Sequence, residues 1–226
     1  MNDLSKKGLV ELIGTFLITF IGGAAIINGQ AGLIGVALAH GLTVAIVISA
    51  LGHISGGHIN PAVTIGFLVT RKIDLKEGGI YILSQLVGAV LAAFALKQFV
   101  PGAMNASLGG QSVAPSVDLG AAIGIEFILT FFLVTAIFGT AVDERGTFQS
   151  IAGFGIGLVV TADILAGGPL TGASMNPARS FGPALISGHW NNHLVYWIGP
   201  LLGGTIAALI YDTFIMNKAE KKGYSE

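Results

Sequence analysis

The sequence contains no cysteine, and only 10% of its 226 residues are charged. Without cysteine there is neither a disulfide framework nor thiolate chemistry. Soluble domains average about 25% charged residues, so this shortage of charge indicates a lipid environment. The formal net charge of −1 gives no argument for nucleic acid or for an acidic partner.

The motifs of common enzyme classes are also missing. No glycine-rich segment is followed by the Lys-Ser/Thr pair of a P-loop, and neither a metalloprotease helix nor a nucleophile elbow is present. His53 and His58 lie five residues apart in a glycine-rich segment, and no third ligand is near them in sequence. We therefore expect no metal, no cofactor and no enzymatic activity.

Long apolar stretches fill most of the chain. A membrane-spanning helix needs about 20 predominantly apolar residues, and six stretches meet this requirement: about 8–28, 33–52, 79–99, 119–141, 150–167 and 193–216. Lys and Arg concentrate near the N-terminus, in the second and fourth connections and near the C-terminus. Because positive charge favours the cytoplasmic side, six spans with both termini cytoplasmic are predicted.

The two halves of the chain repeat each other. Three segments recur at an offset of 115 or 116 residues: Glu11–Phe16 with Glu126–Phe131, Gln85–Ala93 with Pro200–Ala208, and Asn60–Ala62 with Asn176–Ala178. Each repeat, about 4–99 and 119–216, carries three spans, so the second is inverted relative to the first. Residues 101–118 are expected to form a non-helical outer connection, and 217–226 a tail. Inverted repeats place a transport site near the bilayer midplane.

The segments after Asn60 and Asn176 are too short to span a membrane. Asn is a favoured N-cap and Pro a favoured first helical residue, so Asn60-Pro61 and Asn176-Pro177 each predict a helix start. About nine residues reach roughly 14 Å, half of a ~30 Å hydrocarbon core. We therefore predict an all-α membrane protein with six transmembrane helices and two half-helices whose N-termini meet at the centre.

These half-helices predict a pathway for water that excludes protons. Each helix N-terminus carries roughly half a positive charge, which repels cations. Each Asn oxygen is expected to cap its own half-helix, which leaves the amide NH₂ of Asn60 and Asn176 free to donate to a central water. A file of waters oriented away from that point cannot relay protons.

Charged residues at membrane depth are candidates for function. Arg179 lies at a half-helix N-terminus, where its repeat equivalent is Val63, and we interpret it as a selectivity residue. Glu11 and Glu126 are repeat equivalents. Either they relay protons, or they accept hydrogen bonds from the buried loop backbone, the reading that we favour. Asp163 is interpreted as lying at the outer end of the fifth span, without an assigned role.

Two motifs carry a family resemblance. Ser55–Thr64 (SGGHINPAVT) and Thr171–Gly182 (TGASMNPARSFG) resemble the paired motifs of the aquaporins, the major intrinsic proteins, and the likeness covers about residues 5–216. The resemblance implies the aquaporin fold, Asn60, Pro61, Ala62, Asn176, Pro177 and Ala178 as the paired pore motifs, and a homotetramer with one water path per subunit.

The resemblance also implies a selectivity filter at four positions: His40, Ile164, Ala173 and Arg179. This set is similar to that of the plant tonoplast intrinsic branch and differs from the Phe and His usual in strict water channels at the first two positions. The same comparison places Gln111 as a possible extra filter residue. His58 is expected to line the cytoplasmic half of the pore.

The sequence therefore predicts a passive water channel in a lipid bilayer that also passes ammonia, hydrogen peroxide or urea and excludes ions and protons. Ser180 directly after Arg179 argues against a dedicated glycerol channel, which usually has Asp there. An ion-coupled secondary transporter, a glycerol-permeable channel and an adhesive protein with an occluded pore remain as alternatives. Short termini suggest a prokaryotic cell membrane, with a vacuolar membrane as the alternative.

Overall fold

The computed structural model describes residues 3–30, 32–145 and 151–216, and the predicted tail 217–226 lies outside them. Six helices are long and apolar enough to cross a membrane. They are α1 (Asp3–Asn28), α2 (Gly32–Ser55), α4 (Leu75–Phe99), α5 (Leu119–Ile137), α6 (Ala152–Thr171) and α8 (Val195–Ile210). Short π-helical turns, η2 (Phe138–Val142) and η4 (Tyr211–Ile215), extend α5 and α8. All six predicted spans are confirmed as helices.

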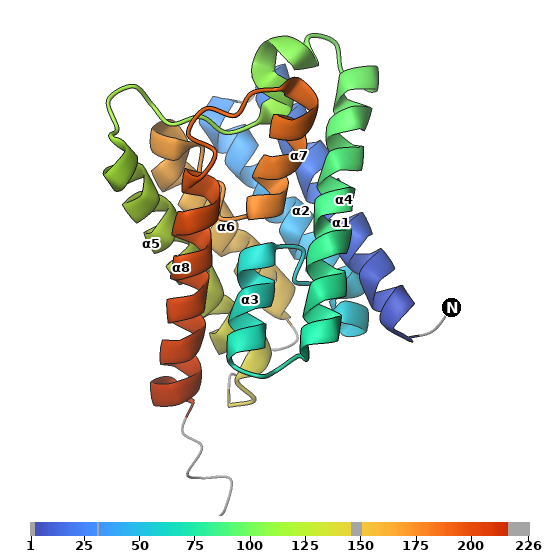
Figure 1. Ribbon diagram of the computed structural model, residues 1–226, viewed down its shortest axis with the longest axis vertical. Coiled ribbons are helices and arrows are strands. Elements are labelled where there is room, and N and C mark those ends of the chain that lie inside the picture. Colours follow the sequence, from blue (N-terminus) through green and yellow to red (C-terminus); the bar gives the residue numbers. More distant parts are fainter. Residues whose placement is uncertain (1–2, 31, 146–150, 217–226) are drawn as a thin grey trace, which may run out of the picture.

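The two remaining helices are the predicted half-helices. They are α3 (Pro61–Val69), of 9 residues, and α7 (Pro177–Ser187), of 11. In Figure 1, α3 lies in the lower half of the bundle and α7 in the upper half. We call the end that carries the start of α1 and the end of α8 the inner face, and the opposite end the outer face.

Glycines allow equivalent helices of the two repeats to approach closely. A Cβ atom at Gly88 of α4 would collide with the carbonyl of Leu12 in α1, and one at Gly203 of α8 would collide with the carbonyl of Phe127 in α5. These two pairs are related by the repeat offset of 115 residues. Small residues at such crossings give close backbone packing in membrane proteins, where the hydrophobic effect between helices is weak.

The outer connection differs from the expectation for 101–118. It contains a short helical segment, η1 (Ala103–Gly109), in which Ser107 and Leu108 take left-handed φ values of 47° and 57°. Leu108 is fully buried in a cluster with Ala93 and Leu96 of α4. The connection folds locally because it packs over the outer ends of α1, α4 and α7 and covers their apolar side chains (Figure 1).

The outward surface of the spans is apolar. Ile34 and Ile46 of α2, Leu83 of α4 and Ile128 of α5 are between 64% and 67% exposed. A lipid-facing helix needs such side chains, because the hydrocarbon core offers polar groups no partner. The polar side chains are instead gathered inside, around the half-helices, where the candidate site lies.

Candidate permeation site

A narrow cavity runs along the contact between the two half-helices. The volume open to the centres of water molecules in this cavity is about 40 Å³. This is room for about three waters, because one buried water needs about 10–15 Å³ of such volume. Its walls bring together most of the residues singled out from the sequence: His40, His58, Asn60, Ile164, Ala173, Asn176 and Arg179. The prolines and alanines of the paired motifs, Pro61, Ala62, Pro177 and Ala178, are buried behind this wall.

Asn60 and Asn176 cap the half-helices and also cross to the opposite repeat. The oxygen of Asn60 accepts from the Ala62 N–H at 2.8 Å, and its amide donates to the carbonyl of Met175 at 2.8 Å. The amide of Asn176 donates to the carbonyl of Ile59 at 2.9 Å, in a reciprocal arrangement. The expectation of a wholly free NH₂ group is therefore wrong, because one N–H of each amide binds the partner loop.

The second N–H of each amide remains for a ligand in the cavity. An NH₂ group carries two donors, and each of these two uses one of them across the repeat. Both asparagines line the cavity. The crossed bonds thus fix the direction of the remaining donors, so that two N–H groups and two positive helix ends face the same point in the passage.

The loops before the half-helices have strained backbones. Ile59 and Met175, which are repeat equivalents, have left-handed φ values of 45° and 53°. Such conformations cost non-glycine residues about 1–3 kcal/mol each and persist only where the surroundings enforce them. Here they turn the carbonyls of Ile59 and Met175 toward the asparagine amides of the opposite repeat.

Two buried carboxylates hold these loops. Glu11 accepts from the backbone N–H groups of His58 at 2.9 Å and Ile59 at 2.5 Å. Glu126 accepts from those of Ser174 at 2.9 Å and Met175 at 2.8 Å. Both side chains are 0% exposed. The contacts are those of a loop support, because irregular backbone at membrane depth must find partners inside the protein.

The predicted filter positions meet near the outer end of the cavity. Nε2 of His40 lies 3.2 Å from Nε and 2.8 Å from Nη2 of Arg179, and its Nδ1 lies 2.8 Å from the carbonyl of Val36. Arginine only donates, and a carbonyl only accepts, so Nδ1 carries the proton and Nε2 accepts. Ile164 and Ala173 add apolar wall to the cavity.

The Arg179 guanidinium has a donor to spare. Its Nη1 atom is buried and has no hydrogen-bond partner among the residues that the structure describes. Arg179 is only 3% exposed and lines the cavity. Since a buried unpaired donor is costly, Nη1 is available to a ligand in the cavity.

His58 lies at the inner part of the same wall. Its Nδ1 is 3.2 Å from the hydroxyl of Thr64, and its ring packs against Phe67 at 4.3 Å and Tyr81 at 5.1 Å between ring centroids. The repeat equivalents make the same link, since Ser174 and Ser180 are 2.5 Å apart between hydroxyl oxygens. In both repeats this bond ties the loop to the half-helix that it precedes.

Gln111 is not among the residues that line the cavity. Its oxygen accepts from the hydroxyl of Ser180 at 2.8 Å, its Nε2 has no partner among the described residues, and it lines a separate polar pocket at the outer face. Gln85 of the first repeat similarly binds Thr64, at 3.0 Å. The position of Gln111 is therefore one that supports α7. Gln85 was missed from the sequence, since its repeat equivalent is Pro200 and the repeat therefore supplies no second copy of it.

Asp163 differs from its predicted place. It lies inside α6, is 3% exposed and has an Oδ2 atom without a hydrogen-bond partner in the described part of the chain. It is absent from the residues that line the cavity. Nothing in the structure explains this acid.

Comparisons with known proteins agree with this geometry. The family model of the major intrinsic proteins matches residues 1–211. The chain is similar to aquaporin TIP4-4 of Zea mays, with 46% identity over 92% of this chain and 86% of that protein. It is also similar to a probable TIP-type aquaporin of Medicago truncatula, with 42% identity over 97% and 91% of the two chains.

A solved structure is similar along nearly the whole chain. The aquaglyceroporin from Plasmodium falciparum superposes with a TM-score of 0.84 at 27% identity, covering 94% of this chain and 97% of that one. The two sequence relatives are plant proteins, so they give no support to the expectation of a prokaryotic cell membrane. The family match, the relatives and the six spans together place this multi-pass membrane protein among the aquaporins, in the major intrinsic protein family.

Proposed function

We propose that this chain is a passive water channel whose path is the cavity between the half-helices. The observation that carries the proposal is the meeting of two capped helix N-termini, two asparagine amides and Arg179 on one narrow cavity. These groups are all hydrogen-bond donors or positive ends of dipoles. Such a surface binds the oxygen of water and repels cations.

Exclusion of protons follows from the direction of the donors. A water that accepts from Asn60 and Asn176 has both of its own hydrogens pointing away along the passage. The neighbouring waters on either side then point outward too, so the file contains no continuous donor chain. The positive ends of α3 and α7 add an electrostatic barrier for hydronium at the same place.

We further propose that His40, Ile164, Ala173 and Arg179 select the permeants. Ile164 and Ala173 offer an apolar wall, and the spare Nη1 of Arg179 supplies one fixed donor. A neutral molecule with one polar end fits this mixture, which supports passage of ammonia, hydrogen peroxide or urea beside water. Ions lose hydration there without gaining compensating ligands.

The inner face is proposed to be cytoplasmic, and the assembly a homotetramer. Lys7, Arg71, Lys72 and Arg145 all lie at the inner face, as the preference of positive charge for the cytoplasmic side requires. The tetramer rests on membership of the family. Protease protection of tagged termini tests the orientation, and native mass measurement in detergent tests the subunit number.

Stopped-flow shrinkage of proteoliposomes tests the channel function. Vesicles with verified protein incorporation should shrink faster than empty vesicles, while an internal pH dye should report no added proton leak. The variant Asn176→Asp adds a negative charge at the meeting point and should lower the barrier to cations. Water permeability equal to that of empty vesicles would exclude the proposal.

A further inference from the structure

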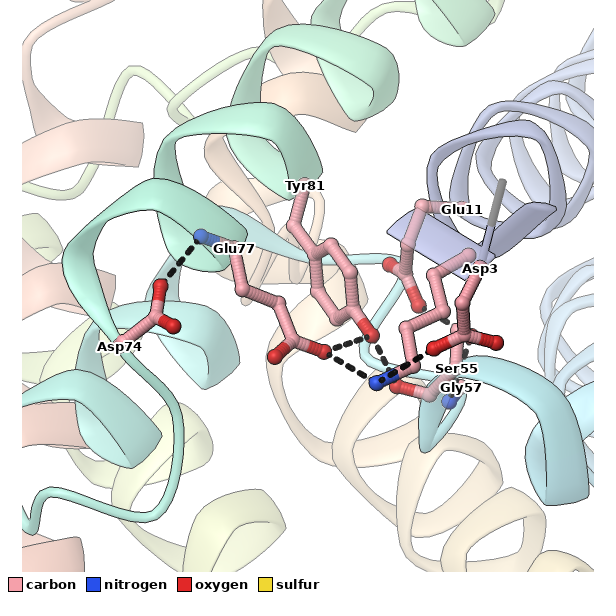
Figure 2. A network of polar contacts seen from close by, with 8 residues as sticks. Asp3, Glu11, Ser55, Gly57, Asp74, Glu77 and Tyr81 are labelled. Atoms are coloured by element: carbon pink, nitrogen blue, oxygen red, sulfur yellow. Dashed lines mark hydrogen bonds and ion pairs between the residues drawn. The ribbon is translucent and has the colours of Figure 1, made fainter. Parts of the chain in front are cut away.

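The hydroxyl of Tyr81 lies between two hydrogen-bond acceptors. Figure 2 shows it pointing toward the carboxylate of Glu77 and the loop that begins at Ser55. Its oxygen is 2.7 Å from the carbonyl of Ser55 and 2.8 Å from Oε1 of Glu77. A tyrosine hydroxyl carries a single proton. The two contacts therefore cannot both be hydrogen bonds donated by Tyr81.

The charge of Glu77 decides which contact Tyr81 makes. An ionised carboxylate accepts hydrogen bonds roughly twice as strong as a neutral carbonyl does, so it draws the Tyr81 proton to itself. The carbonyl of Ser55, at the C-terminal end of α2, then loses its donor. A protonated Glu77 instead donates to the Tyr81 oxygen, and Tyr81 donates to the carbonyl of Ser55.

Glu77 is open to the solution at the inner face. Lys7 of α1 donates to its Oε1 at 3.0 Å and also lies 3.6 Å from Asp3. The side chain of Glu77 is 18% exposed, and that of Asp3 80%. The other charged residues of its surroundings, Arg71, Lys72 and Asp74, line the hollow that Glu77 also lines, and Glu11 lies deeper in the protein.

Tyr81 in turn touches the part of the loop that lines the cavity. Its ring packs edge-on against His58 at 5.1 Å between centroids. Ser55, whose carbonyl it contacts, donates to Glu11 at 2.7 Å and accepts from the N–H of Gly57 at 3.1 Å. A change of partner at the Tyr81 hydroxyl thus acts on both ends of the segment that positions His58.

The second repeat lacks this device. Tyr196, the equivalent of Tyr81, contacts the carbonyl of Thr171 at 2.8 Å, as the repeat predicts. The position equivalent to Glu77 is Asn192, which is exposed in the turn before α8. Because Tyr196 holds its loop with this single bond, the fold does not require a carboxylate beside the tyrosine.

We propose that Glu77 is a positioning residue that couples pH at the inner face to the inner half of the water path. The inference rests on the proposed channel function. With Glu77 ionised, the Tyr81 hydroxyl donates to Glu77 and no longer to the Ser55 carbonyl, so the segment that carries His58 is held less firmly and the path narrows. With Glu77 protonated, Tyr81 holds Ser55, and the path keeps its full width. Water permeability therefore rises as the inner face is acidified.

The test compares the water permeability of proteoliposomes at about pH 7.5 with that at about pH 4. The wild type should gain about two- to tenfold at acid pH, the range expected when one net hydrogen bond changes partner. The amide of Glu77→Gln can donate to Tyr81 without titrating. This variant should therefore have, at both pH values, the high water permeability that the wild type has at acid pH. Glu144→Gln, at an exposed acid of the same face, should respond as the wild type does.

Tyr81→Phe gives an independent reading. Without the hydroxyl, permeability should stay at the low level that the wild type shows at about pH 7.5, whatever the pH. Size-exclusion profiles establish that each variant is folded. If Tyr81→Phe does not fold, the pH response of Glu77→Gln alone tests the inference. A flat profile in the wild type, or an unchanged response in Glu77→Gln, overturns the inference and leaves a working water channel. Loss of all permeability in the wild type would instead remove the channel function itself.

Discussion

Nε2 of His40 is the acceptor that holds Arg179 at the side of the cavity, with contacts of 3.2 Å to Nε and 2.8 Å to Nη2. Nδ1 of the same ring binds the Val36 carbonyl one helical turn earlier. Both ring nitrogens are therefore occupied by the protein. We therefore propose that His40 acts on permeants by orienting Arg179 and by its bulk, with Nη1 of Arg179 as the donor left for them.

Replacing His40 with Phe should change solute selection more than water flow. Phe cannot accept from Arg179, so the guanidinium is released toward the cavity, and the larger ring narrows the passage. We expect urea and ammonia permeability to fall several-fold more than water permeability, measured on the same vesicles. Ile46→Phe, at a 64% exposed position of the same helix, is the matched control. Unchanged solute-to-water ratios in His40→Phe would contradict this role.

Glu126→Gln should destabilise the fold. The carboxylate accepts from the N–H groups of Ser174 and Met175 and from the Thr171 hydroxyl. Gln has one acceptor oxygen, and its NH₂ would face a backbone donor, so at least one buried group is left unpaired at a cost of about 1–3 kcal/mol. Thermal unfolding in detergent measures the effect, and equal midpoints for Glu126→Gln and the exposed Glu144→Gln would refute it.

Two glycines of α4 should respond differently to the same change. Gly88→Ala places a Cβ atom against the carbonyl of Leu12, and such overpacking costs about 1–3 kcal/mol. Gly79→Ala meets open space and should be neutral or stabilising, because Ala loses less backbone entropy in a helix. The difference in unfolding midpoint between the two variants checks the close packing of α4 on α1.

Asp143 should make stability depend on acid pH. Arg145 donates to both of its carboxylate oxygens, at 3.0 and 2.8 Å, and lowers the pKa of Asp143 to about 2. Its folded pKa lies below the ordinary value near 3.9, so the stabilisation is complete above about pH 4 and is lost as pH falls toward 2. The effect is below about 1 kcal/mol, because Arg145 is half exposed.

The measurement compares the wild type with Asp143→Asn. The unfolding midpoint of the wild type should fall between about pH 4 and about pH 2 by more than that of the variant. At neutral pH the variant should be slightly less stable. A larger acid loss in Asp143→Asn than in the wild type would show that the sign assigned to this ion pair is wrong.

Much of the fold could be predicted, because the signals for it are local. Apolar runs of membrane length predicted all six spans, and the Asn-Pro pairs at residues 60 and 176 predicted where α3 and α7 begin. Contacts that join distant segments were not accessible in the same way. The bond from Asn60 to the Met175 carbonyl depends on the left-handed backbone of Met175, which no residue preference at that position predicts.

The candidate site was predictable where the repeat supplied a second copy for comparison. Glu11 and Glu126 occur at equivalent positions, and the structure gives them equivalent contacts. Gln111 and Asp163 have no such counterpart. Their surroundings depend on how the outer connection and α6 pack, and the sequence offered only an alignment for Gln111 and the length of a span for Asp163.

The crossed amide bonds of Asn60 and Asn176 have a consequence for assembly. Each half of the chain supplies the carbonyl that accepts from the asparagine amide of the other half. A single half therefore lacks the acceptor for its own asparagine. Two separately expressed halves, 1–110 and 111–226, would have to find each other before either re-entrant loop could take its final shape. Completion of the water path therefore requires the docking of the second half onto the first.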